Sequence, residues 1–243
     1  MTDTTGALTG LAATAAEKLD ALIGLGGPAL VAIAALSVIG TALILWKFFS
    51  LVHVGAFSGS GRAERAIRDW EAGDRAAARA LLSGRMGVRA RLATQVMSLL
   101  NDPGMPEGLA REETARAARA LLASARSGLR GLELTVTIGP LLGLLGTVTG
   151  MISAFQALQQ AGTRADPATL AGGIWEALLT TAAGMAVAIP AQVALTWFES
   201  RIEALRHDME DQATRLFVAT FRTRGASHAD EDATSVGHHE AAA

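Results

Sequence analysis

The chain has 243 residues, of which 50% are hydrophobic, 18% charged and 5% aromatic, and its mean hydropathy is +0.32. Soluble domains typically carry about 25% charged residues, so this composition indicates a membrane protein with a sizeable water-exposed part. The absence of cysteine excludes disulfides, thiolate metal sites and cysteine nucleophiles, and a formal net charge of −2 gives no basic field that would attract nucleic acid.

The first predicted elements are an N-terminal arm over 1–27 and a transmembrane helix over 28–52. The apolar run from Pro28 to Leu45 carries no charge and is long enough to cross about 30 Å of hydrocarbon. It is too long for the apolar core of a cleaved signal peptide, and the arm before it contains only one lysine, Lys18. Both observations favour a membrane span.

The next region, 53–133, is predicted to be a helical loop in the cytoplasm. Alanine, arginine, leucine and glutamate dominate it, and these residues favour helices. A turn is predicted at Asn101–Pro106, with a new helix from about Glu107. The helices could form an assembly platform, or their charges could simply be solvated faces; the sequence leaves both open.

Two further spans are predicted over 134–158 and 174–198, joined by a short loop over 159–173. The runs Leu134–Leu158 and Ala177–Phe198 contain no charged residue, and three such runs in one chain are unusual for buried helices of a soluble protein. The fold class is therefore an all-α membrane protein with three transmembrane helices and long helical cytoplasmic extensions.

The C-terminal part is predicted to continue as a cytoplasmic helix over 199–224 and to end in a disordered tail over 225–243. The tail has no periodic apolar pattern. It contains His228, His238 and His239, but a disordered end explains these better than a metal site. We expect neither a metal nor a cofactor.

Arginine placement predicts the orientation in the membrane. Most arginines lie between the first two apolar runs or after the third, whereas the arm and the 159–173 loop hold only Lys18 and Arg164. The positive-inside rule then places the N-terminus outside and the C-terminus inside the cytoplasm. The residues expected to mark the cytoplasmic membrane interface are Trp46, Lys47, Trp197 and Arg201.

Small and hydroxyl residues gather in the second and third spans. The second carries two small-xxx-small pairs, Gly139/Gly143 and Gly146/Gly150, and the third carries Gly184 among small residues at helical spacing. Such stripes let helix backbones approach closely. Packing alone does not require the polar residues there, so the same faces could also line a central space; these polar residues are Thr147, Thr149, Thr180, Thr181 and Glu176. Pro140 and Pro190 are predicted to kink their helices.

Glu176 is interpreted as the only acid in or beside the spans, at the outer end of the third span. It shares a helix face with Thr180, while Thr181 is rotated away. It could be an interfacial carboxylate in water or an ionisable group at a proton entrance. No Asp, Glu or His lies in the middle of a span, so a proton-conducting complex would need a carboxylate from a partner.

Two motifs carry a family resemblance. The segment GPLLGLLGTVTGMISAF at Gly139–Phe155 closely resembles the second-helix signature of the MotA/TolQ/ExbB proton-channel family, and WEALLTTAAGMAVAIPAQVA at Trp175–Ala194 resembles its third-helix signature. The layout of three spans with a large cytoplasmic loop agrees with the ExbB and TolQ branches rather than with MotA. The wording PLLGLLGTV is nearer to ExbB.

The resemblance implies a homopentamer in a bacterial inner membrane. Its second and third helices would surround ExbD-type single-span chains that carry a transmembrane Asp, and a TonB-type protein would transmit the work to outer-membrane transport. By motif position, Thr147, Thr181 and Glu176 match pore-lining polar residues, and Thr180 is an extra hydroxyl, so which threonine faces the pore stays open. A TolQ-type role in envelope integrity and a non-conducting membrane scaffold are the alternatives. No nucleophile–base pair or phosphate loop suggests an enzyme.

Overall fold

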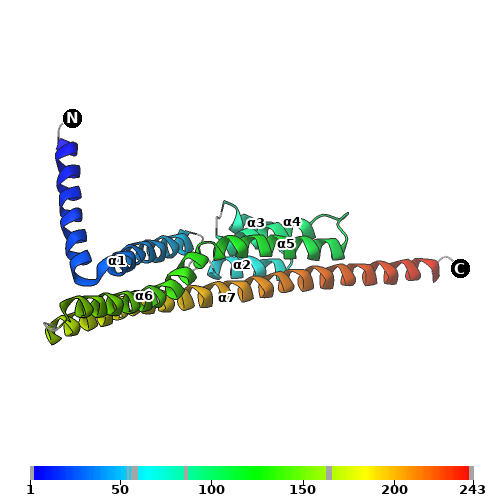
Figure 1. Ribbon diagram of the computed structural model, residues 1–243. Coiled ribbons are helices and arrows are strands. Elements are labelled where there is room, and N and C mark those ends of the chain that lie inside the picture. The colour runs from blue at the N-terminus through cyan, green and yellow to red at the C-terminus, as the bar shows by residue number, and fades with distance from the viewer. Residues whose placement is uncertain (1–2, 54, 56–59, 85–86, 163–165, 241–243) are drawn as a thin grey trace. The chain divides into compact units, whose positions relative to one another are not determined.

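The computed structural model describes the backbone of residues 3–53, 55, 60–84, 87–162 and 166–240, and side chains within 27–52, 55, 61–84, 87–162 and 166–223. The described residues form seven helices and no strand (Figure 1). The helices are α1 (Asp3–His53), α2 (Ser60–Glu71), α3 (Arg75–Leu82), α4 (Val88–Leu100), α5 (Glu107–Arg126), α6 (Leu129–Ala161) and α7 (Pro167–Glu240).

Three helical stretches are long and apolar enough to cross a membrane: Gly27–Val52 in α1, Leu129–Ala161, which is all of α6, and a part of α7 within Pro167–Thr223. Large apolar side chains on these stretches, such as Val38, Leu141 and Val193, are exposed. An exposed apolar surface of this kind suits a lipid environment or a partner helix. The prediction of an all-helical protein with three membrane-crossing helices is confirmed.

The chain divides into two compact units, each built from separate segments. The first unit comprises residues 1–47 and 128–197 and contains the three apolar stretches. In it, α1 packs on α6 through small residues, since a Cβ on Gly40 would lie 2.9 Å from Cγ2 of Thr135. Thr135 is almost completely buried, and its hydroxyl donates a hydrogen bond to the backbone carbonyl of Gly131.

Helix α1 begins at Asp3, so the predicted arm is helical where it is described. Gly27 interrupts the right-handed conformation with φ +62°, and Pro28 follows it. The left-handed conformation costs a residue with a Cβ about 1–2 kcal/mol, and glycine avoids this cost. Proline is well suited to the first turn of a helix. The membrane-crossing part of α1 therefore begins at this Gly–Pro pair.

The second unit comprises residues 48–127 and 198–243 and contains α2 to α5 with the rest of α7. Its core is a stripe of buried residues on α7 at alternating spacings of three and four: Phe198, Ile202, Leu205, Met209, Gln212, Leu216 and Ala219. This spacing keeps one helix face against its neighbours. Four of these residues, Ile202, Leu205, Met209 and Leu216, already form an apolar stripe at helical spacing in the sequence.

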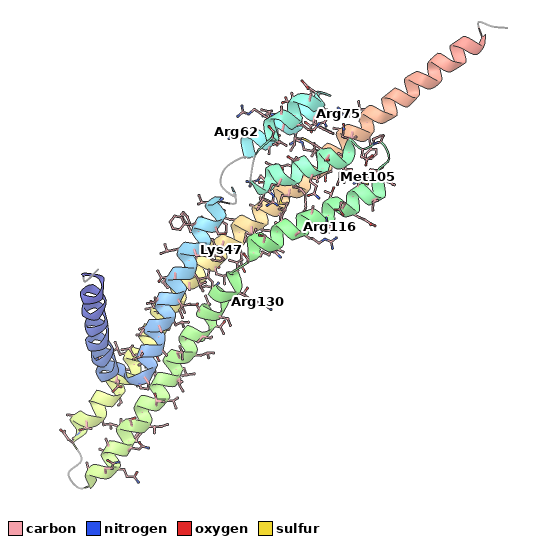
Figure 2. The ribbon with its side chains drawn as sticks, turned by 90° about the horizontal axis from the view of Figure 1, so that it is seen from above. Lys47, Arg62, Arg75, Met105, Arg116 and Arg130 are labelled. Atoms are coloured by element: carbon pink, nitrogen blue, oxygen red, sulfur yellow. The ribbon has the colours of Figure 1, made fainter. Side chains whose placement is uncertain are left out.

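Polar contacts tie α2 and α4 to α7 inside this unit. Arg215 of α7 binds both Glu64 and Glu71 of α2, with nitrogen–oxygen distances of 2.8 Å to each. The indole of Trp70 donates a buried hydrogen bond of 2.9 Å to the hydroxyl of Thr220. On α4, Arg89 pairs with Asp208 at 2.6 Å. Figure 2 labels three arginines of this unit, Arg62, Arg75 and Arg116.

Two boundaries differ from those predicted. The connection between α6 and α7 is shorter than 159–173, because α6 continues to Ala161 and α7 begins at Pro167. Asp166 caps α7, its carboxylate accepting the backbone N–H of Ala168, and proline suits the first helical position. Helix α7 also continues to Glu240, whereas the sequence analysis expected a disordered tail over 225–243. The tail contains no proline that would break a helix and several alanines that favour one, against two glycines, Gly225 and Gly237.

Candidate functional site

The glycines of α6 form a seam with the small residues of α7. A Cβ placed on Gly139 would lie 3.0 Å from the carbonyl oxygen of Gly184, and one on Gly143 would lie 2.9 Å from Cα of Thr181. At the end of the seam nearest the α6–α7 connection, a Cβ on Gly150 would lie 3.2 Å from Cβ of Ala177. The two backbones thus approach as closely as backbones can, which is the arrangement that small residues permit in membrane helices.

Thr180 lies inside this seam. Its side chain is 1% exposed, and a Cβ on Gly146 would lie 2.7 Å from Cβ of Thr180. Its hydroxyl donates to the carbonyl of Ala177 on its own helix at 2.8 Å. Within one chain, Thr180 therefore fills the seam and has its hydrogen bond already satisfied.

Thr181 is arranged differently. It is half-buried, and its hydroxyl donates across the seam to the backbone carbonyl of Gly143 at 3.1 Å. The same carbonyl is, by helix geometry, the acceptor for the backbone N–H of Thr147, four residues further along α6. Thr181 and Thr147 are thus linked to one peptide group of α6, and Thr181 is the threonine of α7 that lies beside the Thr147 turn.

Thr147 and Thr149 lie on the part of α6 that is open to its surroundings. Thr147 is half-buried and donates to the carbonyl of Leu144 at 2.7 Å, while Thr149 is exposed and donates to the carbonyls of Leu145 and Gly146. Thr147 also lines an open hollow on α6 whose other residues are Val148, Met151, Ile152, Phe155, Gln156 and Gln159. Its oxygen lone pairs remain available to water or to a partner's donor, because donating uses only the hydroxyl hydrogen.

Glu176 is half-buried and lies next to the start of the first span. Its Oε1 atom is 3.5 Å from the position that a Cβ on Gly27 would occupy. A carboxylate at the N-terminal end of a helix interacts favourably with the helix dipole. The structure therefore brings Glu176 to Gly27 of α1, while Thr181 points to Gly143 of α6.

The predicted kink residues lie inside continuous helices. Helix α6 runs through Pro140 and α7 runs through Pro190, and both rings are exposed. Each proline lacks a backbone N–H and so leaves the carbonyl four residues earlier without its helical donor. The kinks themselves stay a prediction.

Glu133 was missed when the acids beside the spans were considered. It is the fifth residue of α6, directly before the uncharged run, and its side chain is exposed. The signal was present in the sequence as a carboxylate adjoining Leu134. It was overlooked because the run was counted from the first apolar residue rather than from the start of the helix. Figure 2 shows the beginning of α6 at Arg130.

Comparison with known proteins gives the family. Residues 85–211, just over half of the chain, match the MotA/TolQ/ExbB proton channel family. The chain belongs to this family. The matched residues cover α4, α5, α6 and the seam-forming part of α7, so the family assignment includes the glycine seam and the threonines described above.

Individual relatives carry ExbB and TolQ names. The chain is 37% identical over 119 residues to the biopolymer transport protein ExbB1 of Vibrio cholerae, an alignment that covers 47% of this chain and 50% of the relative. It is 38% identical over 111 residues to the Tol-Pal system protein TolQ of Pseudomonas aeruginosa, covering 44% and 48%. A putative ExbB-like protein of Synechocystis is 53% identical over 66 residues, 26% of each chain.

The chain thus spans half or less of the length of these curated relatives. The resemblance to the family is confirmed, and ExbB and TolQ relatives match to a similar degree. Family membership and the three apolar helices indicate a protein of the bacterial inner membrane that belongs to a channel family rather than to a family of enzymes.

Proposed function

We propose that this chain is the proton-channel and stator subunit of an ExbB–ExbD type complex, which uses the proton motive force to energise TonB-dependent transport across the outer membrane. In this proposal the N-terminus is periplasmic and the C-terminus cytoplasmic, as the arginine distribution predicts. The observation that carries the proposal is the pair Thr147 and Thr181, linked through the Gly143 peptide group at the open side of the α6–α7 seam.

The channel needs a carboxylate that this chain does not hold in the middle of its spans. The runs 134–158 and 177–198 contain no ionisable side chain, and a hydroxyl alone cannot switch its charge at neutral pH. A single-span, ExbD-type partner with a transmembrane Asp would supply the missing group. The chain would form a homopentamer around the partner helices, with α6 and α7 facing them.

The roles of the residues in this proposal are modest. Thr147 accepts hydrogen bonds from water or from the protonated partner Asp, and Thr181 holds the peptide group beside it. Glu176 attracts protons near the periplasmic mouth. A protonated Asp crosses an apolar zone far more cheaply than a charged one, and this difference links movement of the partner helix to protonation. A TonB-type protein would receive the resulting work.

A TolQ-type role in a Tol-Pal system is the second candidate. It is supported by the 38% identity to a TolQ protein, which is close to the 37% identity to an ExbB protein. The two candidates share the mechanism and differ in the partner, so the neighbouring carboxylate-bearing chain distinguishes them. A third candidate, a scaffold that binds partner helices without conducting protons, uses the same seam.

Native mass spectrometry tests the assembly. The detergent-purified chain is measured alone and after co-expression with candidate ExbD-type and TolR-type partners. A pentamer that takes up partner chains supports the proposal, and the partner that is retained selects between the ExbB and TolQ roles. A monomer or dimer that ignores both partners would contradict it.

Proton flux into liposomes tests conduction. The assembled complex is reconstituted, a pH gradient is imposed and internal pH is followed with a fluorescent dye. Flux that is abolished by replacing the partner's transmembrane Asp supports the channel. An assembled complex without flux would leave the scaffold role as the better description.

A further inference from the structure

Glu133 occupies an unusual place for a charged residue. It lies one turn inside α6, within a stretch that is long and apolar enough to span a membrane, and its side chain is exposed. Its carboxylate forms no salt bridge with any residue in the described part of the chain, although Arg130 lies three residues earlier on the same helix. An unpaired ionisable group in a membrane helix is costly and faces water or a protein-lined path.

The position of Glu133 on α6 relates it to Thr147. The two residues are fourteen apart, which is two repeats of seven, so they share a face of the helix about 21 Å apart along its axis. Thr137 lies one turn from Glu133, is exposed, and donates its hydroxyl to the backbone carbonyl of Glu133 at 2.9 Å. Thr147 also lies one turn from Gly143, so this face borders the seam face that carries Gly139, Gly143 and Gly146.

A third polar group lies between the two ends of this face. Pro140 has no N–H, so the carbonyl of Val136 lacks its usual helical donor, and Val136 is half-buried. The face therefore presents the carboxylate of Glu133, the free carbonyl of Val136 and the hydroxyl of Thr137 close together, with Thr147 about 15 Å further along the helix axis. Polar groups this close together share ordered water molecules, and Glu133 is the ionisable group among them.

We propose that Glu133 is the proton acceptor at the cytoplasmic end of the channel. A hydronium ion on this face passes its excess proton to a Glu133 carboxylate oxygen and is left as neutral water, so that one O–H bond forms as another breaks. The resulting carboxylic acid then releases the same proton to cytoplasmic water and returns to the carboxylate. No electron transfer or additional reactant is involved. The proposal rests on the proposed channel function, because it requires proton flow past Thr147.

The decisive variant is Glu133→Gln in the complete complex with its partner. It keeps the size and polarity of the side chain but removes its ability to take up a proton. We expect proton flux in liposomes to fall about tenfold or more, which is less than the roughly 10²–10⁴-fold that a positioned proton-transfer group contributes to a chemical step. Subunit stoichiometry by native mass spectrometry should not change. Glu133→Asp, which retains a carboxylate, should retain a substantial part of the flux.

Glu112→Gln is the matched control. Glu112 is an exposed glutamate of α5 that forms no salt bridge with described residues and belongs to the other unit. The same loss of one carboxylate there should leave flux unchanged. A drop of equal size in both variants would mean that flux follows overall charge, and would overturn the role of Glu133.

The outcomes separate this inference from the proposed function. No flux through the wild-type complex contradicts the channel itself, whatever Glu133 does. Wild-type flux that falls in Thr147→Val but stays unchanged in Glu133→Gln overturns the inference alone. If Glu133→Gln does not assemble, the comparison moves to the shorter pair Glu133→Asp and Glu133→Asn, and equal flux through these two would overturn it.

Discussion

The hydroxyl of Thr181 donates to the backbone carbonyl of Gly143, and this 3.1 Å bond joins α7 to α6. The adjacent Thr180 instead donates to its own helix and packs against Gly146. Two neighbouring threonines therefore have separate tasks: Thr180 fills the seam, and Thr181 bonds across it. Which of the two threonines faces a pore stays a prediction.

Replacing Thr181 should weaken the α6–α7 contact. Thr181→Val keeps the volume and loses the hydrogen bond, so we expect a destabilisation of about 1 kcal/mol, measured by thermal unfolding of the purified chain in detergent. Thr181→Ser should restore most of the loss because it retains the hydroxyl. Equal unfolding temperatures for the wild type and Thr181→Val would show that the bond contributes nothing.

Thr147→Val should lower proton flux while leaving assembly intact, because the valine cannot accept a hydrogen bond from water or from the partner. Flux is measured in the reconstituted complex and assembly by native mass spectrometry. Thr149→Val is the control, since Thr149 is exposed and points to a different face of α6. Unchanged flux in Thr147→Val would remove Thr147 from the pathway.

Gly184→Ala should disrupt the seam. The new Cβ would lie 2.5 Å from the carbonyl oxygen of Gly139 and 3.2 Å from Cα of Gly143, so the backbones must separate, at an expected cost of about 1–3 kcal/mol. Gly172→Ala on the same helix has no atom within 4 Å of its Cβ and should leave stability unchanged or slightly raised. Pentamer yield and unfolding temperature are the measurements. Equal behaviour of the two variants would mean that the seam tolerates expansion.

Glu176→Ala should weaken either partner uptake or proton flux, because it removes the acid proposed for the periplasmic mouth. The variant also removes the carboxylate that lies beside Gly27, so unfolding temperature is measured with it to separate a local packing effect from a pathway effect. Normal uptake and normal flux together would return Glu176 to the role of an interfacial carboxylate in water.

Arg215→Ala should destabilise the second unit by roughly 1 kcal/mol, since the groups it pairs with are partly exposed and screened by solvent. The hydrogen bond from Arg215 holds the pKa of Glu71 below its ordinary value of 4.5. A depressed folded pKa adds stability that is fully present above about pH 4.5 and is lost as the pH falls through the folded value.

The stability difference between the wild type and Arg215→Ala should accordingly be constant near neutral pH and shrink below about pH 4.5. Arg116→Ala, which removes an exposed pair with Glu113 on the surface of α5, should have little effect at any pH. A difference between the wild type and Arg215→Ala that grows on acidification would contradict the role of Glu71.

Much of the architecture could be predicted from the sequence because membrane spans leave strong signals. Uncharged runs identify the three apolar stretches, and the spacing of Ile202, Leu205 and Met209 identifies the buried face of α7. The family motifs contain the seam glycines and the threonines Thr147, Thr180 and Thr181, so the sequence points to these residues, while their place in a proton pathway stays a prediction. These signals are local, so they can be recognised in the sequence without knowledge of the tertiary structure.

The tertiary relationships could not be predicted. No sequence pattern shows that Glu176 meets Gly27, or that Arg215 finds two glutamates of α2. Lys47, expected at the membrane interface, is 1% exposed, because burial depends on neighbours that lie far away in the sequence. The end of α7 at Glu240 also lies beyond the predicted one, because a weak apolar pattern does not by itself stop a helix that lacks proline, and the disorder of the tail stays a prediction.

The close approach of Gly146 and Thr180 has an evolutionary consequence. A methyl group at 146 needs the space that the Thr180 side chain occupies, so residue 146 cannot grow by itself. An alanine at 146 becomes tolerable only after residue 180 has shrunk, and the order of the two changes matters. Among natural variants of this chain, the combined volume of the two side chains should be inherited more faithfully than the identity of either residue.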